Sequence, residues 1–428
     1  MRSKGEFVGV VDFGSREVRV LVARKDADGA IQVVGHGVAA GRGCVSQGVI
    51  QDLSAAQVAF HHAVTAAEKE GRVKITSLFC GINGRNVETF IREGKVKLAH
   101  EIVEHGHMKE ALDQASRDIL APGKHITSSI TSREWYVDDL RVIDPIDIRG
   151  QVLKVRVHFA RLPAVIADNL TSCIESQHRD LEDLVFLPLA SALGCLTPED
   201  MDLGVAVLDM GYSTTGLAVY REHRIFGTHC FEWGGNHITR DVAAGLQVSF
   251  EEADELIAQY GISEERIRAE AREENGAEDM FPRKNYNVRI KLRCAVRGAP
   301  PVVERSQLDE IIYERAKELL TKVRQHLRAR GLIDHLVRGV VLTGGVSRLG
   351  NQAALAEAVF QVPCRVGLPD SVEILPHAAN APEFSAAVGL VRHAFAYRAA
   401  LRAGRIEGRG PGGSRFRRLG HAFRKYFF

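Results

Sequence analysis

The chain has 428 residues, and its 56 lysines and arginines stand against 54 aspartates and glutamates, a formal net charge of +2. With 45% hydrophobic and 26% charged residues the composition is that of a globular protein, which excludes the disordered and fibrous classes. The charge is unevenly placed: residues 401–428 hold eight basic side chains and one acidic, a charge of +7, whereas the other 400 residues hold 48 and 53 and carry −5. A cationic end on a slightly acidic body indicates an anionic partner such as lipid or nucleic acid.

Cysteine usage and hydropathy both bear on where the protein resides. The seven cysteines are odd in number, scattered and without a CxxC pair, so we expect reduced thiols rather than a disulfide framework or a zinc site. No run of about 18 apolar residues could cross a bilayer, and the polar residues 1–6 are not followed by a secretory apolar segment. We therefore expect the protein on the cytoplasmic side of the membrane.

The first clear element is a hairpin that recurs nearly two hundred residues later. Apolar residues 7–11 end at Asp12, a turn of small residues follows, and residues 18–22 form a second β-rich run. The same unit returns as the run 205–208, Asp209, a turn rich in small and hydroxyl residues, and the run 217–220. Duplication at this long period predicts two similar domains rather than a solenoid, whose periods are about 20–50 residues.

Helix and strand patterns alternate through both halves. In the first half, helices are expected at 53–70 and 164–176, and the section 86–159 between them has its own strands at 126–137 and 151–159 and a helix at 108–120. We interpret that section as a compact insert. In the second half the patterns predict helices at 236–245, 250–260 and 307–330, a strand at 337–342 and a helix from about 351. This alternation predicts an α/β fold with mixed sheets.

Four glycine-centred turns carry the candidate chemistry. Glycine lets backbone amides approach a phosphate closely, hydroxyls add donors, and a carboxylate can hold Mg²⁺ through its waters. Besides the two hairpins there are the later glycine pairs Gly234-Gly235 and Gly344-Gly345, the second of which follows the strand expected at 337–342. We expect all four turns to meet at one cleft.

With these motifs the chain resembles the actin-like ATPase superfamily, and within it the FtsA family of bacterial cell-division proteins. The resemblance is carried by residues 35–50, 187–193, 203–218, 233–239, 250–254 and 340–345. It implies a two-domain actin-like fold of duplicated ribonuclease H-like halves, with an FtsA-type inserted subdomain and a C-terminal amphipathic helix.

The resemblance also implies domain boundaries. They are 1–85 with 160–200 for the first half (1A), 86–159 for the insert (1C), 201–240 with 335–402 for the second half (2A), 241–334 for subdomain 2B, 403–413 for a flexible linker and 414–428 for the amphipathic helix.

By the same resemblance, the hairpins clamp the phosphates of ATP, Asp12 and Asp209 hold hydrated Mg²⁺, and Asp254 lies on the ribose side. Gly344 and Gly345 line the adenosine side. The whole set implied for ATP and Mg²⁺ is Asp12, Gly14, Ser15, Asp209, Gly211, Tyr212, Ser213, Thr214, Gly234, Gly235, Asn236, Asp254, Gly344 and Gly345.

Four positions depart from the pattern of the family. Glu17 stands where the first hairpin usually ends in Lys, Gly216 where the second usually has Asp, and Ile257 where Lys usually follows the ribose-side acid. Leu187 stands where hydrolytic relatives often carry Gln or Glu to orient water. A carboxylate near a triphosphate removes attraction and adds repulsion. We therefore expect ATP binding with weak or absent hydrolysis, and no catalytic residue.

The cationic end has a regular aromatic stripe. At about 100° per residue, Phe416, Phe423 and Phe427 share one helix face, flanked by Leu419 and Tyr426. The other face holds cations, among them Arg417, Arg418, Arg424 and Lys425. A helix of about 15 residues is too short to span a ~30 Å hydrocarbon core, so we expect it to lie in the interface of an anionic membrane. Nucleic acid would leave the stripe unexplained.

Two further clusters, one of basic residues and one of histidines, lie outside these motifs. The basic residues Arg289, Lys291, Arg293 and Arg297 are either a solvated face or, by resemblance, a contact for the C-terminal peptide of FtsZ, the tubulin-like ring protein. The histidines His100, His105 and His107 fit no common metal-site spacing, so no zinc is expected there.

The resemblance thus implies a protein that binds ATP, polymerises, and tethers FtsZ polymers to the cytoplasmic face of the inner membrane at the division septum, beside other divisome proteins. One alternative is a sugar or small-molecule kinase of the same superfamily. Another is a membrane assembly protein with a decayed nucleotide site.

Overall fold

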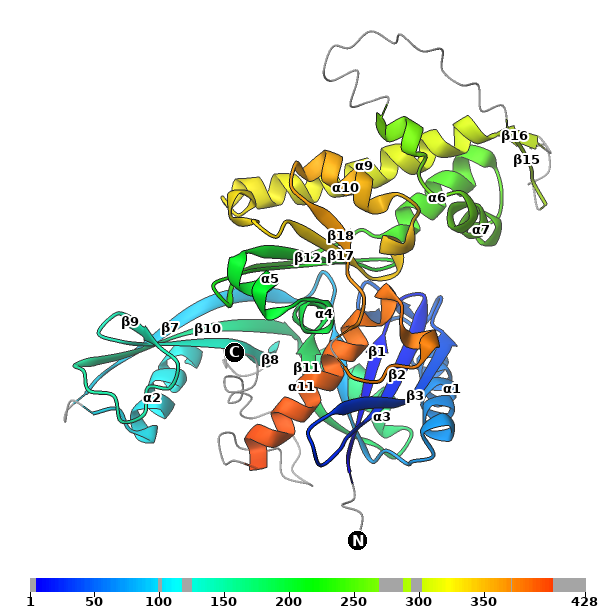
Figure 1. Ribbon diagram of the computed structural model, residues 1–428. Helices are drawn as coiled ribbons and strands as arrows, with labels where there is room; N and C mark the ends of the chain where they lie inside the picture. The colour runs from blue at the N-terminus through cyan, green and yellow to red at the C-terminus, as the bar shows by residue number, and fades with distance from the viewer. Residues whose placement is uncertain are drawn as a thin grey trace.

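The computed structural model describes residues 5–98, 102–117, 125–268, 288–293, 302–370 and 372–402, without the side chains of residues 125–133 (Figure 1). Two bodies lie one above the other, and an arm extends from the lower one to the side. The expected linker and amphipathic helix, residues 403–428, lie outside the described residues.

The first half is built on a five-stranded mixed sheet in the order β11-β6-β1-β2-β3. Neighbours β1, β2 and β3 are antiparallel, whereas β6 and β11 run parallel to β1. The strands are β1 (Glu6–Phe13), β2 (Glu17–Lys25), β3 (Ile31–Ala40), β6 (Ser77–Ile82) and β11 (Asp180–Phe186). A short pair, β4 (Val45–Ser46) and β5 (Val49–Ile50), follows β3.

The second half repeats this topology. Its sheet has the order β14-β13-β12-β17-β18, with antiparallel neighbours on one side of β12 and parallel ones on the other. The strands are β12 (Val205–Met210), β13 (Thr215–Arg221), β14 (Arg224–Phe231), β17 (Val340–Thr343) and β18 (Cys364–Val366). Order and strand sense agree position by position, so the duplication predicted from the two hairpins is confirmed.

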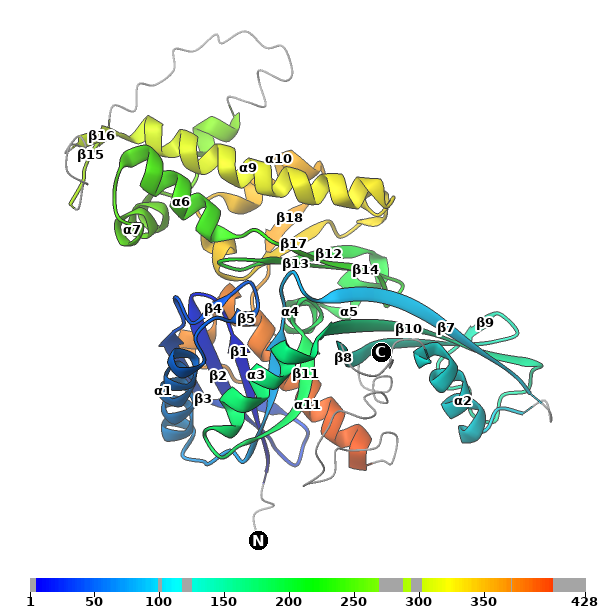
Figure 2. The same cartoon turned by 180° about the vertical axis from the view of Figure 1, so that it is seen from behind.

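The arm is the predicted insert. Its antiparallel sheet has the order β7-β10-β8-β9, and helix α2 (His105–Ser116) packs against β7 and β10 around its own small core (Figure 2). The strands are β7 (Glu88–Lys97), β8 (His125–Val137), β9 (Leu140–Val142) and β10 (Val152–Pro163). Helix α2 begins three residues before the predicted start at 108, because Glu104 and His107 form a capping box there.

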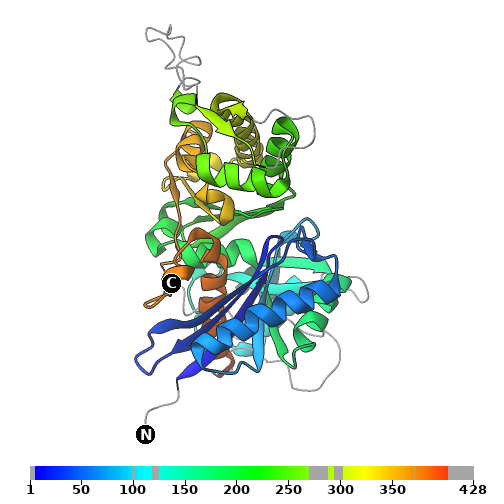
Figure 3. The ribbon, with the colours of Figure 1, turned by 90° about the vertical axis from the view of Figure 1, so that its right-hand side faces the viewer.

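Helices cover both faces of the first sheet (Figure 3). On one face, α1 (Leu53–Gly71) and α3 (Ala164–Glu175) enclose a core that includes Phe60 and Leu184. On the other face lie α4 (Leu187–Cys195) and α11 (Ser385–Arg402), the last described helix of the chain. These two helices cross closely, since a side-chain carbon on Gly389 would lie 1.7 Å from the carbonyl oxygen of Ala190.

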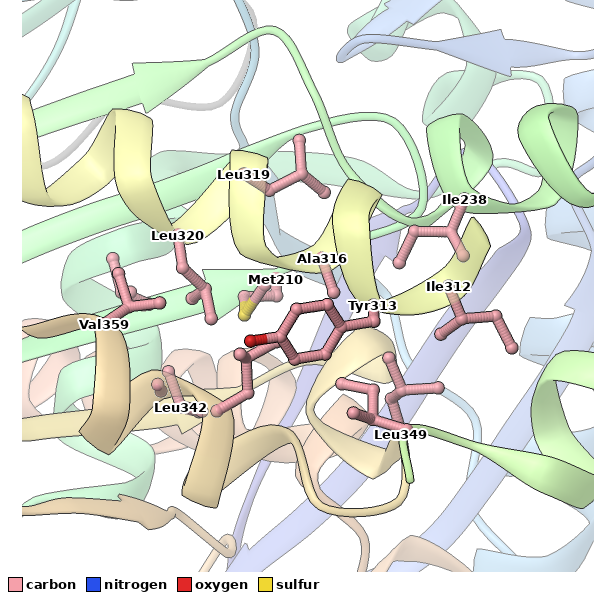
Figure 4. Packing of buried hydrophobic residues seen from close by; sticks show 14 of the residues in the cluster. Met210, Ile238, Ile312, Tyr313, Ala316, Leu319, Leu320, Leu342, Leu349 and Val359 are labelled. Carbon is pink, nitrogen blue, oxygen red and sulfur yellow. The ribbon is translucent and has the colours of Figure 1, made fainter. Parts of the chain in front are cut away.

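The second half is covered by helices on the side away from the first. Figure 4 shows side chains of α9, among them Tyr313 and Leu320, pointing toward Met210 of β12 and Leu342 of β17. The helices of this layer are α6 (Gly235–Leu246), α7 (Phe250–Tyr260), α9 (Arg305–Ala329) and α10 (Gln352–Phe360). Helix α5 (Pro198–Leu203) packs on β13, and the short strands β15 (Arg289–Lys291) and β16 (Val302–Glu304) pair beside α9.

The segment α4 joins the halves. Nearly all of its residues are buried, because one side packs on α11 and the other on β12 and β13. Apart from Ser191 the helix is apolar all round, which is typical of a helix buried on every side. The hairpins β1–β2 and β12–β13 are thereby brought to face each other.

No helix among the described residues is long and apolar enough to cross a membrane. Of the cysteines, the six in the described part of the chain are free thiols, and four of them are buried. The domain boundaries given above stay predictions.

Candidate functional site

A cleft of about 440 Å³ lies between the two halves, where the hairpins meet. Twelve of the fourteen residues predicted for nucleotide and metal line it: Asp12, Gly14, Ser15, Asp209, Gly211, Tyr212, Ser213, Thr214, Gly235, Asp254, Gly344 and Gly345. The other two, Gly234 and Asn236, are not among its lining residues. The structure therefore gathers into one cavity turns that are up to 333 residues apart in the chain.

The two hairpins touch at their tips. The hydroxyl oxygens of Ser15 and Ser213 are 2.6 Å apart, and the amide of Gln47 donates to Ser213 Oγ at 3.0 Å. At the floor, Asn83 Nδ2 donates to Thr214 Oγ1 at 3.5 Å, and the Cys230 thiol donates to Asn83 Oδ1 at 2.7 Å. These contacts hold the halves together around the cleft.

Two carboxylates face this cavity from equivalent hairpins. Burial raises the pKa of Asp12 to about 6, against the opposing effect of Arg19, and the neighbouring charge of Asp209 raises it further. Burial also raises the pKa of Asp209, although the Ser191 hydroxyl donates to its Oδ2 at 2.6 Å. Two desolvated carboxylates at one cavity are suited to a divalent cation, since oxygen ligands are those that Mg²⁺ prefers. The pair fits the predicted magnesium site.

Arg19 is a cation of this cavity that the sequence motifs do not point to. It lies on β2 and lines the cleft, with Nη2 2.6 Å from Glu17 Oε2. A side-chain carbon on Gly14 would be 3.7 Å from its Nη1, so the guanidinium lies beside the turn of the first hairpin. Its buried Nε has no hydrogen-bond partner in the described part of the chain. The alternation of β2, which places residues 17 and 19 on one face, is the signal that could have identified it.

The glycine turns have two different roles. The first pair packs against the second hairpin: the amides of Gly235 and Asn236 donate to the carbonyls of Gly211 and Tyr212 at 3.0 and 2.7 Å, and a side-chain carbon on Gly234 would lie 2.3 Å from the Gly211 carbonyl oxygen. Gly344 lies in the cleft with φ +80°, and a side-chain carbon there would be 2.5 Å from Asp209 Oδ1. Only glycine fits this turn without moving the carboxylate.

At the mouth of the cleft, side chains of both halves contact the carboxylate of Asp254. Thr239 Oγ1 donates to its Oδ1 at 2.6 Å, and Arg42 pairs with its Oδ2. Arg16 Nη1 lies 3.5 Å from the same Oδ2. Arg16 and Arg42 belong to the first half and Asp254 to α7 of the second, so the mouth is bridged by ion pairs.

The structure explains two of the four departures from the family pattern and places the other two in the cleft. Glu17 pairs with Arg19 and does not stand alone in the cleft. A side-chain carbon on Gly216 would lie 2.5 Å from Pro188 Cγ, so the aspartate of the family pattern has no room. Leu187 and Ile257 both line the cleft and present apolar surface to it.

The other predicted clusters lie away from the cleft. Arg289 and Lys291 are exposed on β15, Arg293 pairs with Glu255, and Arg297 lies outside the described residues. His107 accepts from the amide of Glu104 at the start of α2, and His100 is likewise not described. Among the described residues, no group of three or more metal-ligating side chains gathers.

The duplicated sheets and the interdomain cleft between paired hairpins define an actin-like fold. Among solved structures the chain is similar to the PilM–PilN type IV pilus biogenesis complex, with a TM-score of 0.62 at 15% identity over 92% of this chain and 99% of that one. It is also similar to MreB5 of Spiroplasma citri bound to ADP, with a TM-score of 0.53 at 12% identity over 93% and 98%. The predicted actin-like fold is confirmed.

Within this class the resemblance to FtsA is confirmed. The family model "Cell division protein FtsA" matches residues 206–389. Proteins of that name from Neisseria meningitidis and Pseudomonas aeruginosa are 29% and 27% identical, over 92% and 91% of this chain and 91% and 89% of theirs. The one from Escherichia coli K12 is 26% identical over 90% and 89%.

Proposed function

We propose that the chain is an FtsA-like cell-division protein that binds ATP with Mg²⁺ between its two halves. It assembles with copies of itself and tethers FtsZ polymers to the cytoplasmic membrane at the septum. The relatives that match along nine-tenths of the chain are named as cell-division proteins, which favours this function over the sugar-kinase alternative.

The observation that supports nucleotide binding most directly is the convergence of both hairpins on Asp12, which is buried, and Asp209, which is half-buried. Backbone amides of Gly14 and Gly211, with the hydroxyls of Ser15, Ser213 and Thr214, would receive the phosphates. Mg²⁺ would be held through water by the two carboxylates, and it would supply the charge that neutralises the triphosphate.

The cavity is poorly equipped for hydrolysis. An attacking water needs an acceptor to orient it, and Leu187, which lines the cleft, offers only methyl groups. Leu187 is also fixed in place, because it packs on Gly81, where a side-chain carbon would lie 2.2 Å from Leu187 Cδ2. We propose that ATP acts as a bound ligand that stabilises the closed form rather than as a rapidly consumed substrate.

The membrane and FtsZ parts of the proposal rest on the sequence. Residues 414–428 carry the aromatic stripe and the cations that favour an anionic lipid surface, and several tails in one polymer would bind together more strongly than one. For the FtsZ C-terminal peptide we keep the basic residues Arg289, Lys291, Arg293 and Arg297 as the candidate contact. Arg289 and Lys291 are exposed, as such a contact requires.

Calorimetric titration with ATP, with and without Mg²⁺, tests the central claim. Unaltered protein should bind ATP, Asp209→Ala should lose about tenfold or more in affinity, and chelation of Mg²⁺ should have a similar effect. Asp202→Ala is a matched control, because Asp202 belongs to the same half and is exposed at the end of α5, outside the cleft lining. Absence of ATP binding by the unaltered protein would contradict the proposal and favour a decayed site.

A further inference from the structure

The ion pairs at the mouth of the cleft connect segments that are 212 residues apart. Arg42 stands in the loop between β3 and β4 of the first half, and Asp254 stands on α7 of the second. Besides Asp254, Arg42 approaches Glu251 Oε1 at 3.6 Å and lies over the Tyr212 ring, 5.5 Å from its centroid. One arginine of the first half thus contacts three side chains of the second.

The two oxygens of Asp254 are held from opposite directions. Thr239 of α6, which belongs to the same half, donates to Oδ1 at 2.6 Å. Oδ2 receives Arg42 from across the cleft. Because Asp254 is only 9% exposed, this charge-assisted bond is well shielded from water and fixes the carboxylate plane.

Arg42 contacts Asp254 from outside the cleft. Asp254 lines the cleft, as do Arg16 and Tyr212, but Arg42 is not among the lining residues. It therefore holds the carboxylate without taking the space of a ligand. A carboxylate has about four acceptor positions, so Asp254 can keep both protein donors and still accept from a hydroxyl inside the cavity.

We propose that Arg42 is a positioning residue for recognition of a ribose hydroxyl by Asp254, and that it makes this recognition depend on closure of the two halves. The inference rests on the proposed binding of ATP. In an open cleft Asp254 would keep only Thr239 and could turn away, whereas closure brings Arg42 against it. A nucleotide with ribose hydroxyls then gains a preoriented acceptor, and one without them gains nothing from Arg42.

The test compares ATP with 2′,3′-dideoxy-ATP, which has the same base and triphosphate but no ribose hydroxyl. Dissociation constants are measured with Mg²⁺ for the unaltered protein, Arg42→Ala, Arg42→Lys and Asp254→Asn. We expect the unaltered protein to prefer ATP by about tenfold, as for a lost hydrogen bond to a charged acceptor. Arg42→Ala and Asp254→Asn should bring the ratio close to one, mainly by weakening ATP, and Arg42→Lys should restore part of it.

Arg24→Ala is the matched control. It removes the same charge from the same half, where Arg24 donates to Gln32 and is not among the residues that line the cleft. It should leave the ratio of the two dissociation constants unchanged.

The outcomes separate this inference from the proposed function. If the unaltered protein binds both nucleotides and Arg42→Ala keeps the preference for ATP, the role of Arg42 is wrong while nucleotide binding stands. Equal weakening of both nucleotides by Arg42→Ala would assign Arg42 to general attraction and also overturns the inference. If the unaltered protein binds neither nucleotide, the inference and the proposed function fail together. Arg42→Lys serves in place of Arg42→Ala if the latter does not fold.

Discussion

Glu17 and Arg19 form an ion pair of 2.6 Å on one face of β2, and the guanidinium of Arg19 lies beside the turn of the first hairpin. The carboxylate that the sequence presents as an obstacle to a triphosphate is therefore neutralised by its neighbour. Burial raises the pKa of both Asp12 and Asp209, and Arg19 opposes this rise in each, so its charge contributes to the charge balance of the cleft.

Arg19→Gln should weaken ATP binding by about tenfold or more, and Glu17→Gln should strengthen it severalfold, because it releases the arginine for phosphate. Calorimetric titration checks both. Arg24→Gln is the matched control: it removes a charge from the same strand, where Arg24 pairs with Gln32 away from the cleft. Equal losses for Arg19→Gln and Arg24→Gln would show that only net charge matters.

Gly216→Asp, which restores the usual family residue, should destabilise the protein by about 1–3 kcal/mol, the cost of overpacking. The new side chain would collide with Pro188, whose Cγ would be 2.5 Å from its first carbon. Urea unfolding measures the effect, and Pro188→Ala in the same chain should recover part of it. Gly106→Ala is the control, since a side-chain carbon there meets nothing within 4 Å. A fully stable Gly216→Asp protein would mean that Pro188 does not hold its position.

His158 lies at a contact between the insert and the second half, and we expect this contact to be acid-sensitive. Its Nε2 lies 2.8 Å from Thr228 Oγ1 of β14, and burial, with the nearby charge of Arg156, lowers its pKa from 6.5 to about 3. A neutral folded histidine that is charged when unfolded stabilises the fold above pH 6.5, and this contribution is lost as pH falls toward 3.

His158→Gln keeps a donor for Thr228 but does not titrate. Between pH 6.5 and 5 its free energy of unfolding should therefore fall less steeply than that of the unaltered protein, by up to about 1.4 kcal/mol per pH unit. Denaturant unfolding at several pH values gives both slopes. Parallel slopes for His158→Gln and unaltered protein would contradict the pKa shift.

Membrane binding should depend on the aromatic stripe of residues 414–428. Leu419→Glu with Phe423→Glu should abolish co-sedimentation with anionic vesicles, because it places two charges on the face that enters the lipid. Gly412→Glu with Gly413→Glu is the control, since it adds the same charge in the predicted linker. If the stripe variant sediments as well as the unaltered protein, the anchoring proposal is wrong.

Much of the fold was predictable because it rests on local patterns. The hairpin unit is repeated, helix 250–260 agrees with α7 to the residue, and the cleft gathers nearly all the predicted glycines and hydroxyls. The start of α2 was missed because the capping pair Glu104 and His107 is not a common one. Arg42, Asn83 and Ser191 were missed because nothing near them in the chain points to a partner far away.

The sequence by itself determined the duplicated hairpins, the insert and the separation of charge between body and terminus, since each is set by the order and periodicity of neighbouring residues. Only the tertiary structure decided the electrostatics of the cleft. Glu17 is neutralised by Arg19, Gly216 is required by Pro188, and Asp254 is held by Arg42. Charge and packing act through distance in space, and the folding of two halves around α4 places these groups together however far apart they stand in the chain.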